Sequence, residues 1–236
     1  GNWEEREGNS NIEEEYLINY LRSKDYSEEH ISKAIFELQQ VATNFSDDLY
    51  PTNKNVYSKL RNGVKVKVSA GKNYDTVKLI NWQDPEDNDF YIAEEVTLKG
   101  NKTKRPDIVL YINGIAIAVL ELKRGIVDIG EGIRQNITNM QDRFIQPFFA
   151  TNQILFSGND SEGLRYGTIS SEEKFYLSWK EDVEDNSRLL LDKYLIKMCS
   201  KERIIELIYD FIVFETGIKK LPRAHQYFGV KESQKY

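Results

Sequence analysis

The stretch RPDIVLYINGIAIAVLELK, residues 105–123, decides the fold of this chain. It contains two apolar runs, 108–112 and 115–122, separated by Asn113-Gly114, a pair that favours a tight turn between antiparallel strands. Both runs are apolar on consecutive residues. We therefore expect two neighbouring strands that are covered on both faces and lie near the centre of a sheet.

Three charged residues lie at the open end of this predicted hairpin. Asp107 precedes the first strand, and Glu121 and Lys123 end the second. Alternate residues of a strand share a face, so Glu121 and Lys123 point to the same side. Carboxylate oxygens are ligands that Mg²⁺ prefers, and a lysine beside them can hold an attacking water and contact a phosphate. Asp107 and Glu121 are thus candidate magnesium ligands, and Lys123 is a candidate catalytic residue for phosphodiester cleavage.

The register of the hairpin decides whether this site can exist. The simplest interpretation of Asn113-Gly114 is a two-residue loop. In that register Asp107 lies opposite Leu120, and Glu121 points to the other face of the sheet. A regular two-residue turn would therefore separate the two carboxylates.

A three-residue loop over 112–114, with Gly114 in the left-handed position, shifts the pairing by one residue. Asp107 then pairs with Val119, and Glu121 becomes its diagonal neighbour on the same face, at a backbone distance of roughly 7–8 Å. The site thus requires an odd-numbered loop or a bulge in this hairpin, and we predict one.

Patterns elsewhere in the chain predict an α/β fold with a mixed β-sheet core flanked by helices. Several segments show the helical period, and others show strand alternation or short apolar runs. Helices are expected over residues 12–21, 28–41, 50–62, 131–144, 187–199 and 201–215, and further strands over 64–68, 75–82, 90–98 and 153–157. The glycine-rich residues 157–171 are expected to form a loop.

The composition is that of an ordinary globular protein, with 40% hydrophobic and 30% charged residues among 236. No apolar run is long enough to span a bilayer, and no signal peptide is visible at the start. The single cysteine, Cys199, excludes an internal disulfide framework, fits a reducing cytoplasm and is expected in the core. His30 and His225 stand far apart, so carboxylate and lysine chemistry is favoured over histidine chemistry.

The net charge of −6 argues against a protein that simply coats nucleic acid, but a local basic groove is compatible with it. Basic residues cluster in the sequence around the predicted hairpin and are candidates for salt-sensitive contacts with DNA phosphates. They are Lys99, Lys102, Lys104, Arg105, Lys123, Arg124 and Arg134.

The run 105–123 resembles the PD-(D/E)XK motif in the N-terminal nuclease domain of type I restriction enzyme R subunits. Other segments recur in that family's order, and the resemblance extends from about residue 12 to the end. These segments are residues 88–90, 147–152, 167–168, 175–180 and 225–227. The resemblance implies a restriction-endonuclease-like fold and cleavage of double-stranded DNA. It also implies that Asp107 and Glu121 bind Mg²⁺ and that Lys123 is the catalytic lysine.

Members of this family also carry a Gln-x-x-x-Tyr element on the helix after the catalytic strand. Gln135 matches its first position and is a further candidate catalytic residue, in contact with DNA or with Lys123. Asn139 stands where tyrosine is usual, so no role is predicted for it. The first helix of such folds often adds an acidic residue near the metal, and Glu14 and Glu15 both remain candidates beside the simpler interpretation of a solvated helix face. At residue 81, where an aspartate is expected, the chain has asparagine.

The resemblance further implies a longer protein, in which an ATP-driven DNA translocase follows the nuclease. These 236 residues contain no G-x-x-x-x-G-K-[S/T] loop, so ATP is expected to act only through motor domains outside this chain. We expect a frayed N-terminus over 1–11, a nuclease domain over 12–216 and a truncated linker over 217–236. The expected partners are double-stranded DNA and the methyltransferase and specificity subunits, and no membrane.

Two other interpretations stay open on the sequence. One is a non-catalytic module of the same fold that docks the R subunit onto the methyltransferase core, and the other is a stand-alone nuclease. The presence together of Asp107, Glu121 and Lys123 favours catalysis, because a purely structural domain has no need of this combination.

Overall fold

A six-stranded mixed β-sheet forms the centre of the computed structural model, which describes residues 9–44, 48–68, 73–181, 185 and 187–235. The strand order is β3-β4-β5-β6-β7-β8. Only the β5–β6 pair is parallel, and the other neighbours are antiparallel. The strands are β3 (Phe90–Glu94), β4 (Ile108–Ile112), β5 (Ile115–Leu122), β6 (Ile154–Asn159), β7 (Gly163–Gly167) and β8 (Leu177–Ser178). The predicted central position of β4 and β5 is confirmed.

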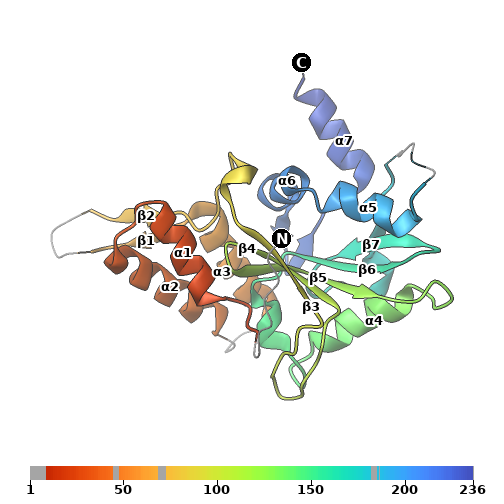
Figure 1. The fold of residues 1–236 in the computed structure, drawn as a ribbon, viewed down its shortest axis with the longest axis horizontal. Coiled ribbons are helices and arrows are strands. Elements are labelled where there is room, and N and C mark those ends of the chain that lie inside the picture. Colours follow the sequence, from red (N-terminus) through yellow and green to blue (C-terminus); the bar gives the residue numbers. More distant parts are fainter. Residues whose placement is uncertain (1–8, 45–47, 69–72, 182–184, 186, 236) are drawn as a thin grey trace.

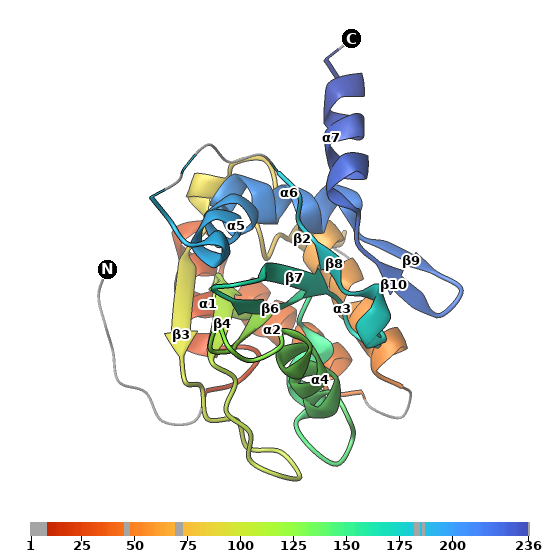
Figure 2. The ribbon, with the colours of Figure 1, turned by 90° about the vertical axis from the view of Figure 1, so that its right-hand side faces the viewer.

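Helices cover both faces of this sheet, which confirms the predicted α/β architecture and fits a restriction-endonuclease-like fold. In Figure 2, α4 lies below the sheet, and α5 and α6 lie above it. The helices are α1 (Glu14–Ser23), α2 (Glu28–Ala42), α3 (Leu49–Asn62), α4 (Gly130–Asn139), α5 (Leu190–Met198), α6 (Lys201–Phe211) and α7 (Ala224–Ser233). Short 3-10 helices span Pro85–Asp87, Gln146–Ala150 and Glu173–Phe175.

Two small antiparallel sheets complete the fold: β1 (Val64–Val66) with β2 (Asp75–Val77), and β9 (Val213–Glu215) with β10 (Ile218–Lys220). Figure 1 shows α1, α2, β1 and β2 together at one end of the molecule. None of the helices in the described ranges is long and apolar enough to cross a membrane.

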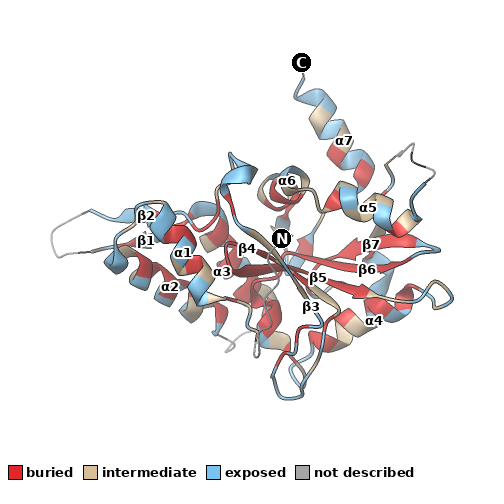
Figure 3. Cartoon of the chain, in the orientation of Figure 1, coloured by how far each residue is buried: buried red, intermediate tan, exposed pale blue. Residues whose placement is uncertain are grey.

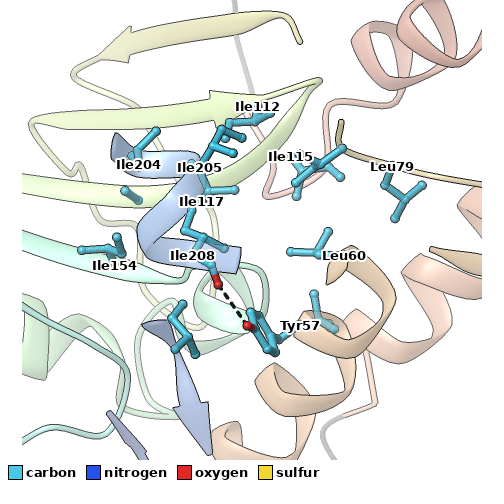
Figure 4. Close-up of a cluster of buried hydrophobic side chains, with 14 of the residues drawn as sticks. Tyr57, Leu60, Leu79, Ile112, Ile115, Ile117, Ile154, Ile204, Ile205 and Ile208 are labelled. Carbon is cyan, nitrogen blue, oxygen red and sulfur yellow. Dashed lines mark hydrogen bonds between the residues drawn. The ribbon is translucent and has the colours of Figure 1, made fainter. Parts of the chain in front are cut away.

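The two faces of the sheet belong to two hydrophobic cores. The α6-side core joins the sheet to α1, α2, α3, α5 and α6, and the α4-side core joins it to α4 and the segment 145–149. Figure 3 shows the buried residues concentrated on the central strands and on the helix faces that pack against them. Figure 4 shows Ile117 of β5 and Ile204 of α6 within the α6-side core, where the Tyr57 hydroxyl donates a hydrogen bond to the Ile208 carbonyl at 2.9 Å.

Local signals place the start of α2 and the end of α3 where the sequence predicts them, whereas α4 ends at Asn139 rather than at 144. The Ser27 hydroxyl accepts a hydrogen bond from the His30 amide and caps α2, which carries two glutamates in its first turn. Helix α3 ends at Gly63, whose φ of 80° favours glycine. An added Cβ at Gly63 would also lie only 2.8 Å from the Val77 carbonyl oxygen, so β2 can approach closely.

The predicted loop over 157–171 is wrong, because β6 continues to Asn159 and β7 follows at once. Gly158 and Gly167 lie in strands where other groups come close. A Cβ at Gly158 would lie 2.4 Å from the Leu191 side chain, and a Cβ at Gly167 would lie 2.9 Å from the Tyr176 ring. These glycines therefore mark close packing rather than turns.

Other predicted boundaries run too far. Strand β2 ends at Val77 rather than at 82, and β3 ends at Glu94, where Glu95 takes a positive φ of 51°. The last predicted helix ends at Phe211, and residues 213–215 form β9 of a hairpin. Its turn is Thr216-Gly217, with φ values of 46° and 80°.

The two chain ends were predicted to be frayed or linker-like. Residues 1–8 lie outside the described residues, whereas residues 10 and 11 contact the sheet: the Tyr111 hydroxyl donates to the Ser10 carbonyl at 3.0 Å. Residues 217–236 include β10 and α7, and Tyr227 of α7 is buried. This segment thus packs against the domain, and its predicted role as a link to a motor stays a prediction.

Candidate functional site

The turn between β4 and β5 has two residues, so the predicted three-residue loop is wrong. Ile112 pairs with Ile115, and Asn113 and Gly114 both have positive φ, 52° and 82°. Asn113 is held in this conformation by its buried side chain, which donates to the Leu79 carbonyl at 2.9 Å. Since tertiary contacts fix this residue, the turn type was not decided by loop geometry alone.

A β-bulge directly after this turn is present, as the prediction of a bulge requires. Tyr111 pairs with Ala116, but Leu110 pairs with Ala118, which leaves Ile117 as an extra residue in β5. Ile117 and Ala118 both belong to the α6-side core. Beyond the bulge, the residues of β5 that point to a given face of the sheet are therefore shifted by one position.

This reset brings the two carboxylates to one face. The ladder pairs Ile108 with Leu120, so its next step places Asp107 level with Glu121, directly opposite rather than diagonal as expected. The Leu122 amide donates a hydrogen bond to Asp107 Oδ2 at 2.7 Å. The backbone of β5 thus holds the Asp107 carboxylate beside Glu121.

The Glu121 side chain is fully buried and only partly hydrogen-bonded. Asn139 Nδ2 donates to Glu121 Oε1 at 3.4 Å, and Oε2 has no hydrogen-bond partner among the described residues. Burial raises the pKa of Glu121 to about 8, and the neighbouring Asp107 carboxylate acts in the same direction. The charges of Lys123 and Lys104 oppose this shift. Such a carboxylate is costly to bury unless a cation compensates it.

Lys123 lies beside the acid pair and is held by a residue of α4. Its Nζ donates to Gln135 Oε1 at 2.7 Å, and its backbone amide donates to the Gly158 carbonyl at 2.9 Å. Gln135 was predicted to contact DNA or Lys123, and the structure shows the contact with Lys123. The Lys123 ammonium is thereby positioned at the end of β5.

A close approach of α4 to the sheet makes these contacts possible. An added Cβ at Gly132 would lie 2.2 Å from Ser157 Oγ and 3.3 Å from the Glu121 carbonyl oxygen. Ser157 Oγ donates to the Ile129 carbonyl at 3.0 Å, and Asn136 Nδ2 donates to the Phe156 carbonyl at 2.9 Å. Helix α4 therefore lies directly on the ends of β5 and β6.

Asn139, which had no predicted role, is one of the residues that touch Glu121. Asn136 and Asn139 are both buried, and they stand three residues apart on the helical face that also carries Gly132. The sequence does contain a signal for this contact, because two asparagines fall on the face of the predicted helix that is expected to be buried. Their significance depends on the position of α4 against β5, which a motif does not give.

The acidic residues of α1 do not reach this site. The Glu13 amide donates to the Gly114 carbonyl, so α1 lies at the turn end of β5. Glu121 is seven residues further along the strand, roughly 23 Å away at about 3.3 Å per residue. Glu14 and Glu15 are exposed, and Glu14 bonds to Gln39 of α2.

Asn81 has a local structural role. Its Oδ1 accepts hydrogen bonds from the amides of Gln83 and Asp84, each at 3.1 Å. Within the described residues, no group of three or more acidic, histidine or cysteine side chains could hold a metal ion. A metal at the hairpin would therefore depend on Asp107 and Glu121.

Comparison with known proteins identifies the relatives of this chain. The family model described as the N terminus of the type I restriction enzyme R protein matches residues 1–174. The chain is 28% identical over 204 residues to the type I restriction enzyme HindI endonuclease subunit of Haemophilus influenzae, covering 79% of this chain and 19% of that protein.

An archaeal relative matches over a longer stretch. The putative type I restriction enzyme MjaVIIIP endonuclease subunit of Methanocaldococcus jannaschii is 29% identical over 236 residues, covering 94% of this chain and 22% of that protein. The chain thus spans about a fifth of the length of these curated relatives. Because the family model covers well over half of the chain, the chain belongs to the family of type I restriction enzyme R proteins and corresponds to their N-terminal region.

Proposed function

We propose that this chain is a magnesium-dependent nuclease domain that cleaves double-stranded DNA at Asp107, Glu121 and Lys123. The observation that carries the proposal is the buried Glu121 carboxylate, with one oxygen unpartnered among the described residues and Asp107 opposite it. The protein compensates this pair only in part, since the Leu122 amide donates to Asp107 and Asn139 donates to Glu121, and burial beside Asp107 raises the pKa of Glu121.

The donor set fits a hard divalent cation. Two carboxylates from adjacent strands would hold Mg²⁺, which prefers oxygen ligands and retains several waters. The bound ion would supply charge neutralisation on the phosphate and a more acidic water. Within the protein, the Leu122 amide orients Asp107, and Asn139 contacts Glu121.

Besides the metal ion, Lys123 would supply a positive charge from a protein side chain beside Asp107 and Glu121. Its ammonium donates to Gln135, which leaves donors free for a phosphate oxygen or an attacking water. We expect Gln135 to act mainly by positioning Lys123. In the full-length protein we expect cleavage to be coupled to ATP-driven translocation by other domains. Methyltransferase and specificity subunits are the expected partners there.

The test uses the full-length subunit with its partner subunits. Asp107→Ala, Glu121→Ala and Lys123→Ala should each reduce DNA cleavage by about a hundredfold or more while ATP hydrolysis persists. The matched control is Glu131→Ala, which removes an exposed carboxylate of α4 that is paired with Arg134.

The outcomes separate catalysis from a docking role. Undiminished cleavage by all three variants would refute the nuclease proposal. Loss of complex assembly in the same variants, measured by size-exclusion chromatography with the partner subunits, would instead favour a docking module. The Glu131→Ala control should leave cleavage, ATP hydrolysis and assembly unchanged.

A further inference from the structure

A protruding β-hairpin arm begins at the acid pair. Beyond β3 and before β4 the backbone stays paired: the Glu95 amide donates to the Asp107 carbonyl at 2.8 Å. Leu98 and Lys104 exchange two hydrogen bonds of 2.9 and 3.0 Å, which close a tip over residues 99–103. Because Asp107 ends this arm, the arm has a fixed relation to the candidate metal site.

The tip of the arm is braced against the loop that follows α4. The Asn101 amide donates to the Phe144 carbonyl at 3.0 Å, and its side chain donates to the Asp142 carbonyl at 2.7 Å. A Cβ at Gly100 would lie 2.3 Å from the Phe144 carbonyl oxygen, so only glycine fits there. Figures 1 and 2 both show these loops together at the bottom of the molecule.

Three cations surround one aromatic ring where the two loops meet. Lys102 Nζ, Lys104 Nζ and the Arg143 guanidinium carbon lie 5.6, 4.2 and 5.1 Å from the centre of the Phe144 ring. We call these four residues the Phe144 cluster. A ring attracts a single cation by about 0.5–1 kcal/mol at an exposed site, but three cations on one ring repel one another.

The cluster has no counter-charge of its own. None of its three cations forms an ion pair with a carboxylate in the described part of the chain. Arg143 Nε donates to the neutral Gln141 side chain, and the Asp142 carboxylate accepts the Arg143 backbone amide. Lys102 and Arg143 are exposed, so their charges are open to an external anion.

Two of the arginines predicted for DNA binding, Arg105 and Arg134, are already paired. Arg105, on the same arm, forms an ion pair with Glu95. Arg134 on α4 pairs with Glu131 at 2.9 Å and Glu173 at 2.6 Å. The structure thus divides the sequence candidates, and it adds Arg143, which was not among them.

We infer that the Phe144 cluster binds the phosphodiester backbone of double-stranded DNA and leads it to the acid pair. The inference rests on the proposed nuclease function. The arm links the two places, because Lys104 Nζ lies 4.2 Å from the centre of the Phe144 ring and the same strand of the arm runs on from Lys104 to Asp107, whose carbonyl is paired with the Glu95 amide. A polyanion held at the cluster would therefore continue towards Asp107. The contacts would be to phosphates and hence independent of base sequence.

The experiment measures binding without cleavage. The 236-residue chain is titrated onto a fluorescent duplex of about 30 base pairs in EDTA, and anisotropy is recorded between about 20 and 200 mM salt. Lys102→Ala/Arg143→Ala should weaken binding about tenfold or more at low salt. It should also lower the slope of log K against log salt by about two, at roughly 0.9 for each lost phosphate contact.

Two matched variants control for charge and for position. Lys59→Ala/Lys220→Ala removes the same two charges elsewhere, where each lysine is paired with a glutamate. Glu172→Ala/Lys174→Ala removes an exposed ion pair elsewhere on the surface without changing the net charge. Both should keep the salt slope within about 0.5 of the unmodified chain.

Equal losses in the cluster variant and the Lys59→Ala/Lys220→Ala variant would overturn the inference, because net charge alone would then explain binding. No measurable binding by the unmodified chain at the lowest salt concentration would overturn it as well. Failure of the nuclease proposal is separate: it would show as cleavage retained by Asp107→Ala, whatever the binding slopes.

Discussion

At the scale of the residue, Glu121 is an acid in a place that disfavours its charge. Burial and the Asp107 carboxylate raise its pKa from 4.5 to about 8. The folded chain therefore keeps a proton that the unfolded chain releases near pH 4.5. Without metal, the stability linked to this proton is fully present below about pH 4.5 and is lost as the pH rises through about 8.

Glu121→Gln should remove most of this pH dependence. In EDTA, the free energy of unfolding of the unmodified chain should fall between about pH 5 and pH 8 relative to the variant. The difference should reach a few kcal/mol, because each tenfold change in a protonation equilibrium corresponds to about 1.4 kcal/mol. Urea unfolding at several pH values measures it, and Glu131→Gln, which changes an exposed carboxylate, is the control. Parallel pH profiles for Glu121→Gln and the unmodified chain would contradict the expectation.

At the scale of the element, the position of α4 depends on the absence of a side chain at Gly132. Gly132→Ala would place a methyl group 2.2 Å from Ser157 Oγ and should push α4 away from β5 and β6. We expect a loss of about 1–3 kcal/mol in the free energy of unfolding. We also expect reduced cleavage, because Gln135 and Asn139 would move away from Lys123 and Glu121.

A glycine-to-alanine change in another helix serves as the control. A Cβ at Gly229 of α7 meets nothing within 4 Å, so Gly229→Ala should be neutral or slightly stabilising. Urea unfolding and cleavage assays on both variants make the comparison. Ser157→Ala should restore part of the lost stability when combined with Gly132→Ala. Equal stability of the two glycine variants would show that α4 does not depend on this contact.

The same scale shows how far the sequence could predict the fold. Consecutive apolar residues correctly predicted that β4 and β5 lie inside the sheet, and β5 is buried on both faces, whereas Ile108 and Leu110 of β4 are only half-buried. The predicted loop length was wrong because two arrangements bring Asp107 and Glu121 to the same face of the sheet. A two-residue turn followed by a bulge at Ile117 does so, and so does the longer loop. The contact of Asn139 with Glu121 could not be predicted, since it depends on how closely α4 approaches the sheet.

At the scale of the whole molecule, one buried lysine joins three distant parts of the chain. Lys219 of β10 donates to Asn53 Oδ1 of α3 at 2.9 Å and to Gln153 Oε1, next to β6, at 2.7 Å. Burial lowers the pKa of Lys219 well below its usual value of 10.5. The β9–β10 hairpin is thus tied to the sheet and to the N-terminal helices by a polar contact within the interior.

This lysine should give the molecule a pH dependence opposite to that of Glu121. A base with a depressed folded pKa is protonated in the unfolded chain but not in the folded one, so its contribution to stability rises with pH until about 10.5 and is lost as the pH falls. Between about pH 8 and pH 10 most of the Glu121 contribution to stability has already been lost. In that window the unmodified chain should gain up to about 1.4 kcal/mol per pH unit relative to Lys219→Met, which has no group to protonate.

Urea unfolding in EDTA at several pH values across this window measures the gain. Lys220→Met, at the exposed neighbouring residue, should match the unmodified chain. If Lys219→Met gains stability over the same range as steeply as the unmodified chain, the lysine is not held neutral in the folded state, and the hairpin would be tied to the sheet by a charged group instead.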